Sequence, residues 1–314
     1  MNKPFIIQNT EIKPDEHKII RLEVGRLPSD TLIHLNINVY RSKNPGPTML
    51  VIGGVHGDEI NGIEILRRAI AQGLFKNLHA GNVIAIPVLN IYGFNNFSRE
   101  VPDGKDVNRS FPGNAKGSLA SRVANIISKK ILPFVDFGID FHTGGNSNYN
   151  YPQVRYSIKH EESKKLGEAF AAPLLIAKKT IPKSFRKIAL DQNIPILTYE
   201  AGENLRLDGF SIDKGLEGIK RVMQTKGMIA GEPAKEKILH FNKTTWMRAV
   251  GSGLFQWMKC SGQKVFKGER LAIICDPYGQ TETPVLASTD GFIIGHNNAP
   301  VVNPGDALFH IATA

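Results

Sequence analysis

The amino-acid sequence predicts an α/β domain followed by a small all-β domain. From about residue 30 to residue 235, short apolar runs typical of buried strands alternate with amphipathic runs typical of helices. Beyond about residue 245 the helical periodicity disappears, and short strand-like runs recur between turns that contain glycine. The segment 230–238, rich in small and charged residues, is the expected linker. We therefore expect one domain at 1–235 and a second at 236–314.

The strands of the first domain are predicted from their apolar runs. Residues 31–40 alternate apolar and polar side chains, as a half-exposed strand does. Four later runs, TMLVIGGV, NVIAIPVLN, VDFGIDFH and IPILTYEAG, are apolar almost throughout. Such runs indicate a mixed, mostly parallel sheet covered by helices on both faces, whose ligands bind at the carboxyl ends of the strands. Helix-like patterns lie between the runs, around Ile63, Leu66 and Ile70 and in SLASRVANIISKKIL, ESKKLGEAFAA, SFRKIALDQ and GLEGIKRVMQTKG.

The tail of the sequence contains an internal echo. The segments DGFIIG and VVNPGDALFHIA repeat the order of SGLFQW and KVFKGERLAIIC. Two similar all-β halves predict a small sandwich or barrel of about 70 residues.

Composition excludes several classes of protein. The net charge of +10 comes from dispersed basic residues with no block of like charges, which argues against nucleic acid and is compatible with an anionic substrate. Only two cysteines are present, so any metal site must use histidine and carboxylate. The first residues lack a signal-peptide core, and no window of about 18 apolar residues occurs. We expect a cytoplasmic protein that does not bind membranes.

The segment VIGGVHGDEINGIEIL places His56 and Glu59 between a predicted strand and a predicted helix. Such a pair carries little information alone, because nine histidines and 29 acidic residues in 314 positions give roughly one by chance. Its place at the carboxyl end of the sheet, after paired glycines that allow a sharp turn, lets both side chains converge on one point. The alternative is a surface turn with a polar helix N-cap.

A second strand end repeats this pattern in GIDFHTGG, where an apolar run ends at His142. Zinc in a hydrolytic site takes three protein ligands and leaves one position open, with two ligands close in sequence and the third distant. His56, Glu59 and His142 fit this requirement. Asp140 shares a strand face with His142 and could orient its imidazole. As alternatives, Asp140 is a buried acid paired with an arginine, and His142 is a satisfied strand-end residue.

The polar loop SREVPDGKDVNRSFPG is long enough to indicate a functional role. Arg99 could stabilise the oxyanion that forms when water attacks an amide carbonyl. Asn108 and Arg109 could bind a carboxylate through a bidentate fork. The alternative is that both arginines form surface ion pairs with Asp103 or Asp106.

The segment ILTYEAGE places Glu200 at the end of another predicted strand. A carboxylate beside a metal-activated water can take its proton and pass it to the leaving amine. Glu203 is the competing candidate, and we prefer Glu200 because Glu203 lies further into the loop.

Four segments, GGVHGDE, DVNRSFPG, DFHTGG and TYEAGE, occur in an order and spacing that resemble the succinylglutamate desuccinylase and aspartoacylase family, a branch of the zinc carboxypeptidase superfamily. The resemblance covers roughly residues 45 to 225. It implies a zinc-carboxypeptidase-like fold and one zinc ion per chain, held by His56, Glu59 and His142.

The resemblance also implies roles for other residues. Glu200 would be the general base and acid, Arg99 would polarise the scissile carbonyl, and Asn108 and Arg109 would bind the substrate carboxylate. The DVNRSFPG form and the β-rich tail are more similar to bacterial deacylase-like members than to animal aspartoacylases.

The tail resembles the biotinyl and lipoyl carrier barrel, whose two quasi-symmetric halves match the internal echo. Carrier proteins present a modified lysine at the hairpin between the halves. Here that region reads CDPYGQTE and contains no lysine, while Lys259 lies in the first half. We expect a role in shielding the active site or in assembly rather than a carrier role.

These observations predict a metal-dependent amidohydrolase. It would hydrolyse the amide bond of an N-acyl amino acid or a related small N-acylated amine that carries a carboxylate. The prediction leaves a homo-oligomer open. The alternatives are a metallocarboxypeptidase that acts on short peptides and a non-enzymatic protein whose barrel mediates binding.

Overall fold

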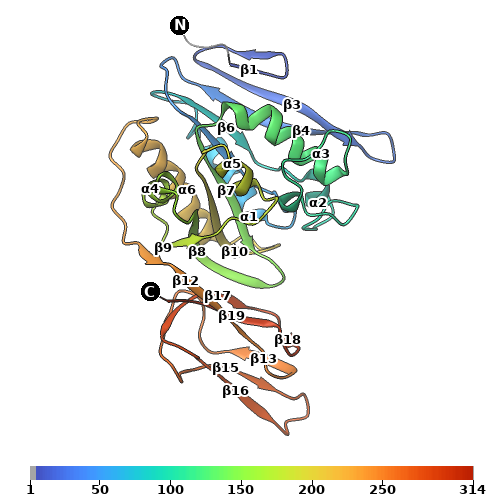
Figure 1. Cartoon of the computed structure of the whole chain (residues 1–314), viewed down its shortest axis with the longest axis vertical. Helices are drawn as coiled ribbons and strands as arrows, with labels where there is room; N and C mark the ends of the chain where they lie inside the picture. Colours follow the sequence, from blue (N-terminus) through green and yellow to red (C-terminus); the bar gives the residue numbers. More distant parts are fainter. Residues whose placement is uncertain (1–4, 314) are drawn as a thin grey trace.

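The structure of the chain, a computed structural model, describes residues 5–313 and contains a mixed sheet of 13 strands (Figure 1). Four central strands run parallel in the order β6, β5, β7 and β10. Every residue of β5 and β7 is buried, which explains their continuous apolar runs. The central strands are β5 (Thr48–Ile52), β6 (Asn82–Ile86), β7 (Phe137–Gly144) and β10 (Ile196–Glu203). The α/β class that the sequence predicts is confirmed.

Further strands, most of them in antiparallel pairs, extend the sheet on both sides of this centre. On one side β4 pairs with β6 and β3 forms the edge, next to the separate hairpin β1–β2. On the other side β8 pairs with β10 and β9 pairs with β8. The sequence patterns do not predict β3, β8 or β9. These outer strands are β1 (Phe5–Ile7), β2 (Thr10–Ile12), β3 (Glu16–Arg26), β4 (Leu32–Arg41), β8 (Asn148–Ser157) and β9 (Leu174–Lys178).

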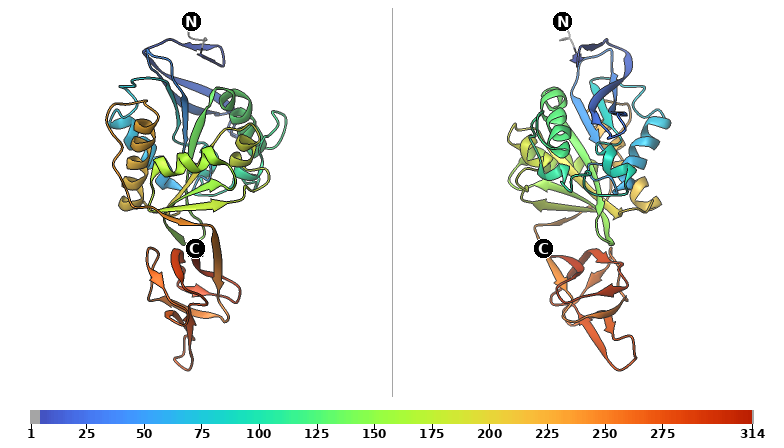
Figure 2. Two further views of the ribbon diagram at one scale, coloured as in Figure 1. Left: turned by 60° about the vertical axis from the view of Figure 1, so that its left-hand side comes forward. Right: turned by 90° about the vertical axis from the view of Figure 1, so that its right-hand side faces the viewer.

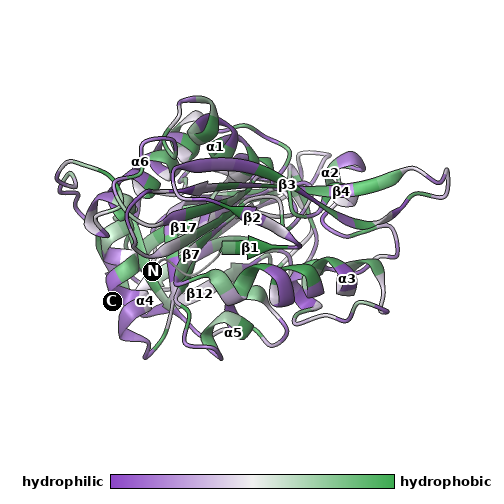
Figure 3. Ribbon diagram, turned by 90° about the horizontal axis from the view of Figure 1, so that it is seen from above, coloured by the Kyte–Doolittle hydropathy of each residue, from purple (hydrophilic) through white to green (hydrophobic). Residues whose placement is uncertain are grey.

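Helices cover both faces of the central strands (Figure 2). One hydrophobic core joins the sheet to α1, α4 and α6, and another joins it to α3 and α5. Seen from above, the sheet lies between α1 and α6 on one side and α3 and α5 on the other (Figure 3). In residues 5–313 no helix has both the length and the apolarity needed to cross a bilayer. The helical segments are α1 (Ile60–Ala71), α2 (Ile91–Asn95), η1 (Val107–Arg109), α3 (Leu119–Ile126), η2 (Ile127–Ile131), η3 (Leu132–Phe134), α4 (Glu161–Phe170), α5 (Phe185–Leu190) and α6 (Gly209–Thr225).

The C-terminal strands form a sandwich that continues the main sheet (Figure 1). Strands β12, β17 and β19 belong to the 13-stranded sheet, and β13, β15, β16 and β18 form a second sheet packed on a shared apolar core. Strand β17 pairs with β8, so the tail and the α/β part share backbone hydrogen bonds. The strands are β11 (Leu239–Phe241), β12 (Lys243–Arg248), β13 (Gly253–Trp257), β14 (Lys264–Val265), β15 (Arg270–Cys275), β16 (Glu282–Leu286), β17 (Gly291–Asn297), β18 (Val301–Val302) and β19 (Ala307–Thr313).

Two histidines are buried in this C-terminal sandwich. His296 accepts a hydrogen bond from the Ser261 hydroxyl at 2.7 Å, and burial lowers its pKa to about 4. His310 stacks on Trp246 with ring centroids 4.2 Å apart, and burial together with nearby Arg155 lowers its pKa to about 2. Both imidazoles are therefore neutral in the folded protein at neutral pH.

These two histidines predict an acid-sensitive fold. An unfolded histidine titrates near pH 6.5, so below this pH the unfolded chain binds protons that folded His296 and His310 do not accept. The free energy of unfolding should fall as the pH drops from 6.5, by up to roughly 1.4 kcal/mol per pH unit for each histidine. Urea unfolding at pH 7 and pH 5 measures this loss. A His296→Gln variant should lose less stability between the two pH values than wild type, whereas His240→Gln, at an exposed position, should match wild type. Equal losses in wild type and His296→Gln would contradict the account.

Candidate active site

His56 and Glu59 lie on the loop between β5 and α1. Gly54 adopts a positive φ of 59°, and a Cβ on Gly57 would collide with the backbone of Gly93, so the loop turns sharply and packs closely. Glu59 occupies the N-cap position of α1, but its side chain makes no capping hydrogen bond. His56 is 3% exposed and Glu59 is 2% exposed. A solvated surface turn with a polar cap therefore does not describe this loop.

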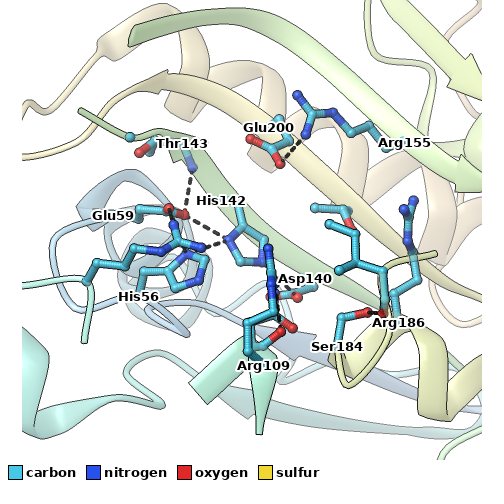
Figure 4. A pocket seen from close by; sticks show the side chains of 15 residues that line it. His56, Glu59, Arg109, Asp140, His142, Thr143, Arg155, Ser184, Arg186 and Glu200 are labelled. Atoms are coloured by element: carbon cyan, nitrogen blue, oxygen red, sulfur yellow. Dashed lines mark hydrogen bonds and ion pairs between the residues drawn. The ribbon is translucent and has the colours of Figure 1, made fainter. Parts of the chain in front are cut away.

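Three side chains converge at this point (Figure 4). The Nδ1 atoms of His56 and His142 lie 3.2 Å apart. The two carboxylate oxygens of Glu59 lie 2.7 Å from Nδ1 of His56 and 2.8 Å from Nδ1 of His142. One donor atom from each of the three residues can be chosen so that all lie within 4.8 Å of one another.

Neighbouring groups orient each member of the cluster. Asp140 Oδ2 lies 2.9 Å from Nε2 of His142, which leaves Nδ1 directed at the cluster. Asp106 Oδ1 lies 3.3 Å from Nε2 of His56, within ion-pair distance but without hydrogen-bond geometry. The backbone N–H of Thr143 donates to Glu59 at 3.0 Å. The sequence indicates Asp106 only as an ion-pair partner of the arginines, because a carboxylate on a loop gives no sign of which histidine it faces.

Charges within the cluster oppose the effect of burial. Burial favours the neutral imidazole of His142, but Asp140 and Glu59 outweigh it and raise its pKa well above the usual value. Burial acts in the same way on His56, and Glu59 and Asp106 raise its pKa. For Glu59 the two imidazoles outweigh burial and hold the pKa of its carboxyl well below its usual range. The acidic groups around the site therefore favour a positive charge between them.

This donor set fits a divalent cation. Two imidazole nitrogens and one carboxylate form a three-ligand set that zinc hydrolases use, with a further position open to substrate or water. The hydrogen bond between Asp140 and His142 is the arrangement that fixes the tautomer of a metal-binding histidine, and Asp106 lies near the corresponding nitrogen of His56. His56, Glu59 and His142 can therefore hold a metal ion.

Arg99 lies against the same cluster and is also ion-paired. Its Nη2 donates to Asp106 at 2.8 Å, and its Nη1 lies 3.3 Å from a carboxylate oxygen of Glu59. The ion pair with Asp106, one of the two alternatives drawn from the sequence, is present. This ion pair is partly buried rather than on the open surface, because the Arg99 side chain is 34% exposed and that of Asp106 is 14% exposed.

Asn108 and Arg109 also line the cavity. The side-chain oxygen of Asn108 accepts the backbone N–H of Phe185 at 2.9 Å, which ties this loop to the start of α5. Arg109 is exposed, and its Nη1 donates to the carbonyl of Asn108 at 2.7 Å. Only the amide nitrogen of the Asn108 side chain is left to donate to a ligand.

Strand alternation places Glu200 on the face that carries His142. The two residues lie side by side in the parallel pairing of β10 with β7. Tyr199, the preceding residue, packs in the core on the side of α1 and α6. Arg155 Nη1 donates to one oxygen of Glu200 at 2.8 Å and Asn150 donates to the other at 2.9 Å. Glu203, in contrast, binds Asn298 at 2.7 Å and does not line the cavity.

The cavity between these groups measures about 240 Å³, and all eight residues predicted from the sequence line it. Sequence reasoning missed two arginines in its wall, Arg155 on β8 and Arg186 on α5. Arg186 is 9% exposed, its Nη1 has no hydrogen-bond partner among the described residues, and burial and Arg155 lower its pKa to about 10. Neither residue lies in a glycine-flanked strand end, so no local pattern marked them.

The catalytic-domain profile of the succinylglutamate desuccinylase/aspartoacylase family matches residues 45–225, more than half of the chain. The chain belongs to this family. Membership makes it an amide-bond hydrolase rather than a peptidase, which argues against the metallocarboxypeptidase alternative.

Three relatives align over nearly the whole chain. The N-α-acetyl-L-2,4-diaminobutyric acid deacetylase of Halomonas elongata is 26% identical over 285 residues, which cover 86% of this chain and 83% of that protein. A succinylglutamate desuccinylase/aspartoacylase from Rhodobacter sphaeroides is 26% identical, with a TM-score of 0.84 and 95% of both chains covered. The product-bound ectoine utilization protein EutE of Ruegeria pomeroyi, 23% identical, has a TM-score of 0.85 with 95% of both chains covered. The last similarity shows a shared fold that includes the C-terminal sandwich.

The cluster predicts a defined metal content. Wild type incubated with zinc should retain about one ion per chain, and His142→Ala should lose it because one of three donors is removed. Asp140→Asn should weaken the affinity roughly 10- to 100-fold, since the imidazole loses its orienting acid. Elemental analysis after gel filtration measures the content, with Glu200→Gln as the cavity control that keeps the ion. An undiminished content in His142→Ala would place the ion elsewhere.

Proposed function

We propose that the chain is a zinc-dependent amidohydrolase that cleaves the amide bond of an N-acyl amino acid or a related small N-acylated amine. The products are a carboxylic acid and a free amine. The main support is one cavity in which a buried His–Glu–His group, a carboxylate on the adjacent strand and several arginines face each other. The Halomonas elongata relative, named for the deacetylation of an N-acetyl amino acid, supports the same class of reaction.

His56, Glu59 and His142 would hold the zinc ion. Zinc held there would supply Lewis-acid polarisation of a carbonyl and would lower the pKa of water enough to make hydroxide available at neutral pH. The residues around the cluster keep its donors in place for this task, because Asp140 and Asp106 lie against the outer nitrogens of the two imidazoles.

Glu200 is the proposed proton carrier. Its carboxylate lines the cavity beside His142 and accepts hydrogen bonds from Asn150 and Arg155. Each oxygen keeps a further lone pair that can accept a proton from water. The same carboxyl then returns the proton to the amine nitrogen as the amide bond breaks. Among the described residues, the one other glutamate that lines this cavity is Glu59, which belongs to the His–Glu–His group.

The arginines define how the substrate is bound. Arg99, next to the cluster, can donate to the carbonyl oxygen as negative charge develops there. Arg109, on the exposed rim beside Asn108, can bind a carboxylate of the substrate. The free carboxylate of an N-acyl amino acid would then lie at the rim and its amide bond near the cluster.

Loss of the proton carrier should separate chemistry from metal binding. We expect wild type to release amine from at least one member of a panel of N-acetyl, N-succinyl and N-formyl amino acids. Glu200→Gln should lower kcat roughly 10²- to 10⁴-fold with a similar KM and a full metal content. Glu203→Gln is the matched control outside the cavity and should keep the wild-type kcat. Full activity in Glu200→Gln would reassign the proton transfer.

Removal of the rim arginine should affect binding more than chemistry. Arg109→Ala should raise KM about 10-fold or more for a substrate with a free carboxylate, because a charge-assisted hydrogen bond is lost. The kcat value should change little. For a methyl-ester analogue, which lacks the free carboxylate, wild type and Arg109→Ala should have similar KM values. Lys105→Ala, from an exposed position in the same loop outside the cavity, is the control. An unchanged KM in Arg109→Ala would exclude this residue from carboxylate binding.

A further inference from the structure

Strand β8 binds both oxygens of the Glu200 carboxylate. Arg155 donates to one oxygen and Asn150 to the other, at 2.8 Å and 2.9 Å (Figure 4 shows the Arg155 contact). The two residues differ in their access to ligands. Arg155 lines the cavity, whereas Asn150 is 5% exposed and does not line it. Asn150 can therefore influence a reaction in the cavity only through the group it holds.

The position of Asn150 depends on the C-terminal part of the chain. Gly295 of β17 lies opposite Asn150 in the antiparallel pairing of β17 with β8. A Cβ built on Gly295 would lie 3.0 Å from the side-chain oxygen of Asn150 and 3.2 Å from the carbonyl oxygen of Tyr149. A side chain at position 295 would thus press on Asn150 and on the backbone beside it.

A second contact from β17 holds the same stretch of β8. Gln153 is fully buried, lies opposite Glu200 in the pairing of β8 with β10, and donates to the carbonyl of Ile294 at 3.0 Å. Beyond the end of β17, the backbone N–H of Asn298 donates to the carbonyl of Ser147 at 2.8 Å, which fixes the turn that precedes β8. The tail therefore contacts β8 before, at and after Asn150.

We propose that Asn150 is a positioning residue for Glu200 and that strand β17 holds Asn150 in place, so that the C-terminal sandwich supports catalysis without lining the cavity. This inference rests on the proposed function of Glu200. Arg155 and Asn150 bind the carboxylate from two sides, which restricts its rotation. The pairing of β8 with β10 changes register between Glu200 and Gly202, next to these contacts. The role differs from walling the cavity mouth, since none of the described residues beyond Glu200, 201–313, lines the cavity.

The test uses two pairs of matched variants of the full-length protein. Asn150→Ala removes the donor, and Asn148→Ala is its control on the same strand, because within residues 5–313 the Asn148 amide donates to the carbonyls of Gly145 and Asn146 and not to Glu200. Gly295→Ala introduces the Cβ against Asn150. Gly251→Ala is its control, since a Cβ there meets nothing within 4 Å. Each variant is assayed for kcat, KM, metal content and thermal midpoint, and the crystal structures of wild type, Asn150→Ala and Gly295→Ala are compared at Glu200.

The expected result is a fall in kcat of about 10- to 100-fold in Asn150→Ala, a smaller fall in Gly295→Ala, and KM within about threefold of wild type. Metal content should be unchanged, both controls should match wild type, and the Glu200 carboxylate should leave its wild-type position in both test variants. Two kinetic results in Asn150→Ala would overturn the inference: a kcat within twofold of wild type, or a rise in KM alone. A Glu200 carboxylate that keeps its wild-type position in the two test variants would also overturn it.

The crystal structures separate this inference from the proposed function. If wild type cleaves no N-acyl amino acid but the Glu200 carboxylate still shifts in Gly295→Ala, the proposed function fails and the coupling from β17 to Glu200 stands. If wild type is active and the carboxylate stays in place, the proposed function stands and the coupling fails. The thermal midpoints show whether each variant is folded, and the two test variants disturb Asn150 in different ways, so agreement between them argues against misfolding of either one.

Discussion

The arrangement of the site depends on the convergence of two imidazoles on one buried carboxylate. Nδ1 of His56 and Nδ1 of His142 lie 2.7 Å and 2.8 Å from the oxygens of Glu59, and all three side chains are buried. An isolated buried carboxylate costs several kcal/mol, so the cluster needs positive charge and hydrogen bonds around it. The neighbours of the cluster meet this need, since the Thr143 backbone and Arg99 donate to Glu59 while Asp140 orients His142. The negative electrostatic potential of the buried carboxylates is the physical basis for placing a cation there.

The sheet supplies this convergence through strand alternation. On β7 and β10 the residues that face the cavity alternate with residues such as Phe141 and Tyr199, which pack in the core beside α1 and α6. The same strands therefore build the core with one set of side chains and the site with the other. A one-residue slip in register would exchange the two sets, so the packing of the core also fixes the position of His142 and Glu200. Strand β8 extends this logic to the C-terminal sandwich, because it contacts Glu200 on one edge and β17 on the other.

The sequence predicts the central fold and the cavity because both depend on local patterns. Apolar runs that end in a histidine or a glutamate mark strand ends, and the glycines beside His56 mark a tight turn. Residues whose role depends on distant pairing were not predicted. Asn150 and Arg155 lie in NYNYPQVRYS, where proline and polar residues obscure the strand that β10 and β17 hold in place. Arg186 belongs to a predicted helix, but only the fold turns it into the cavity. The sequence likewise predicts a β-rich tail without indicating that β17 joins the main sheet.

The most direct test of the account is a crystal structure of the zinc-loaded protein with anomalous scattering measured on both sides of the zinc absorption edge. The account predicts a single strong peak between Nδ1 of His56, Nδ1 of His142 and the carboxylate of Glu59. A peak bound by other residues would contradict it. So would the absence of a peak between these three side chains, in their present places, from crystals grown with excess zinc.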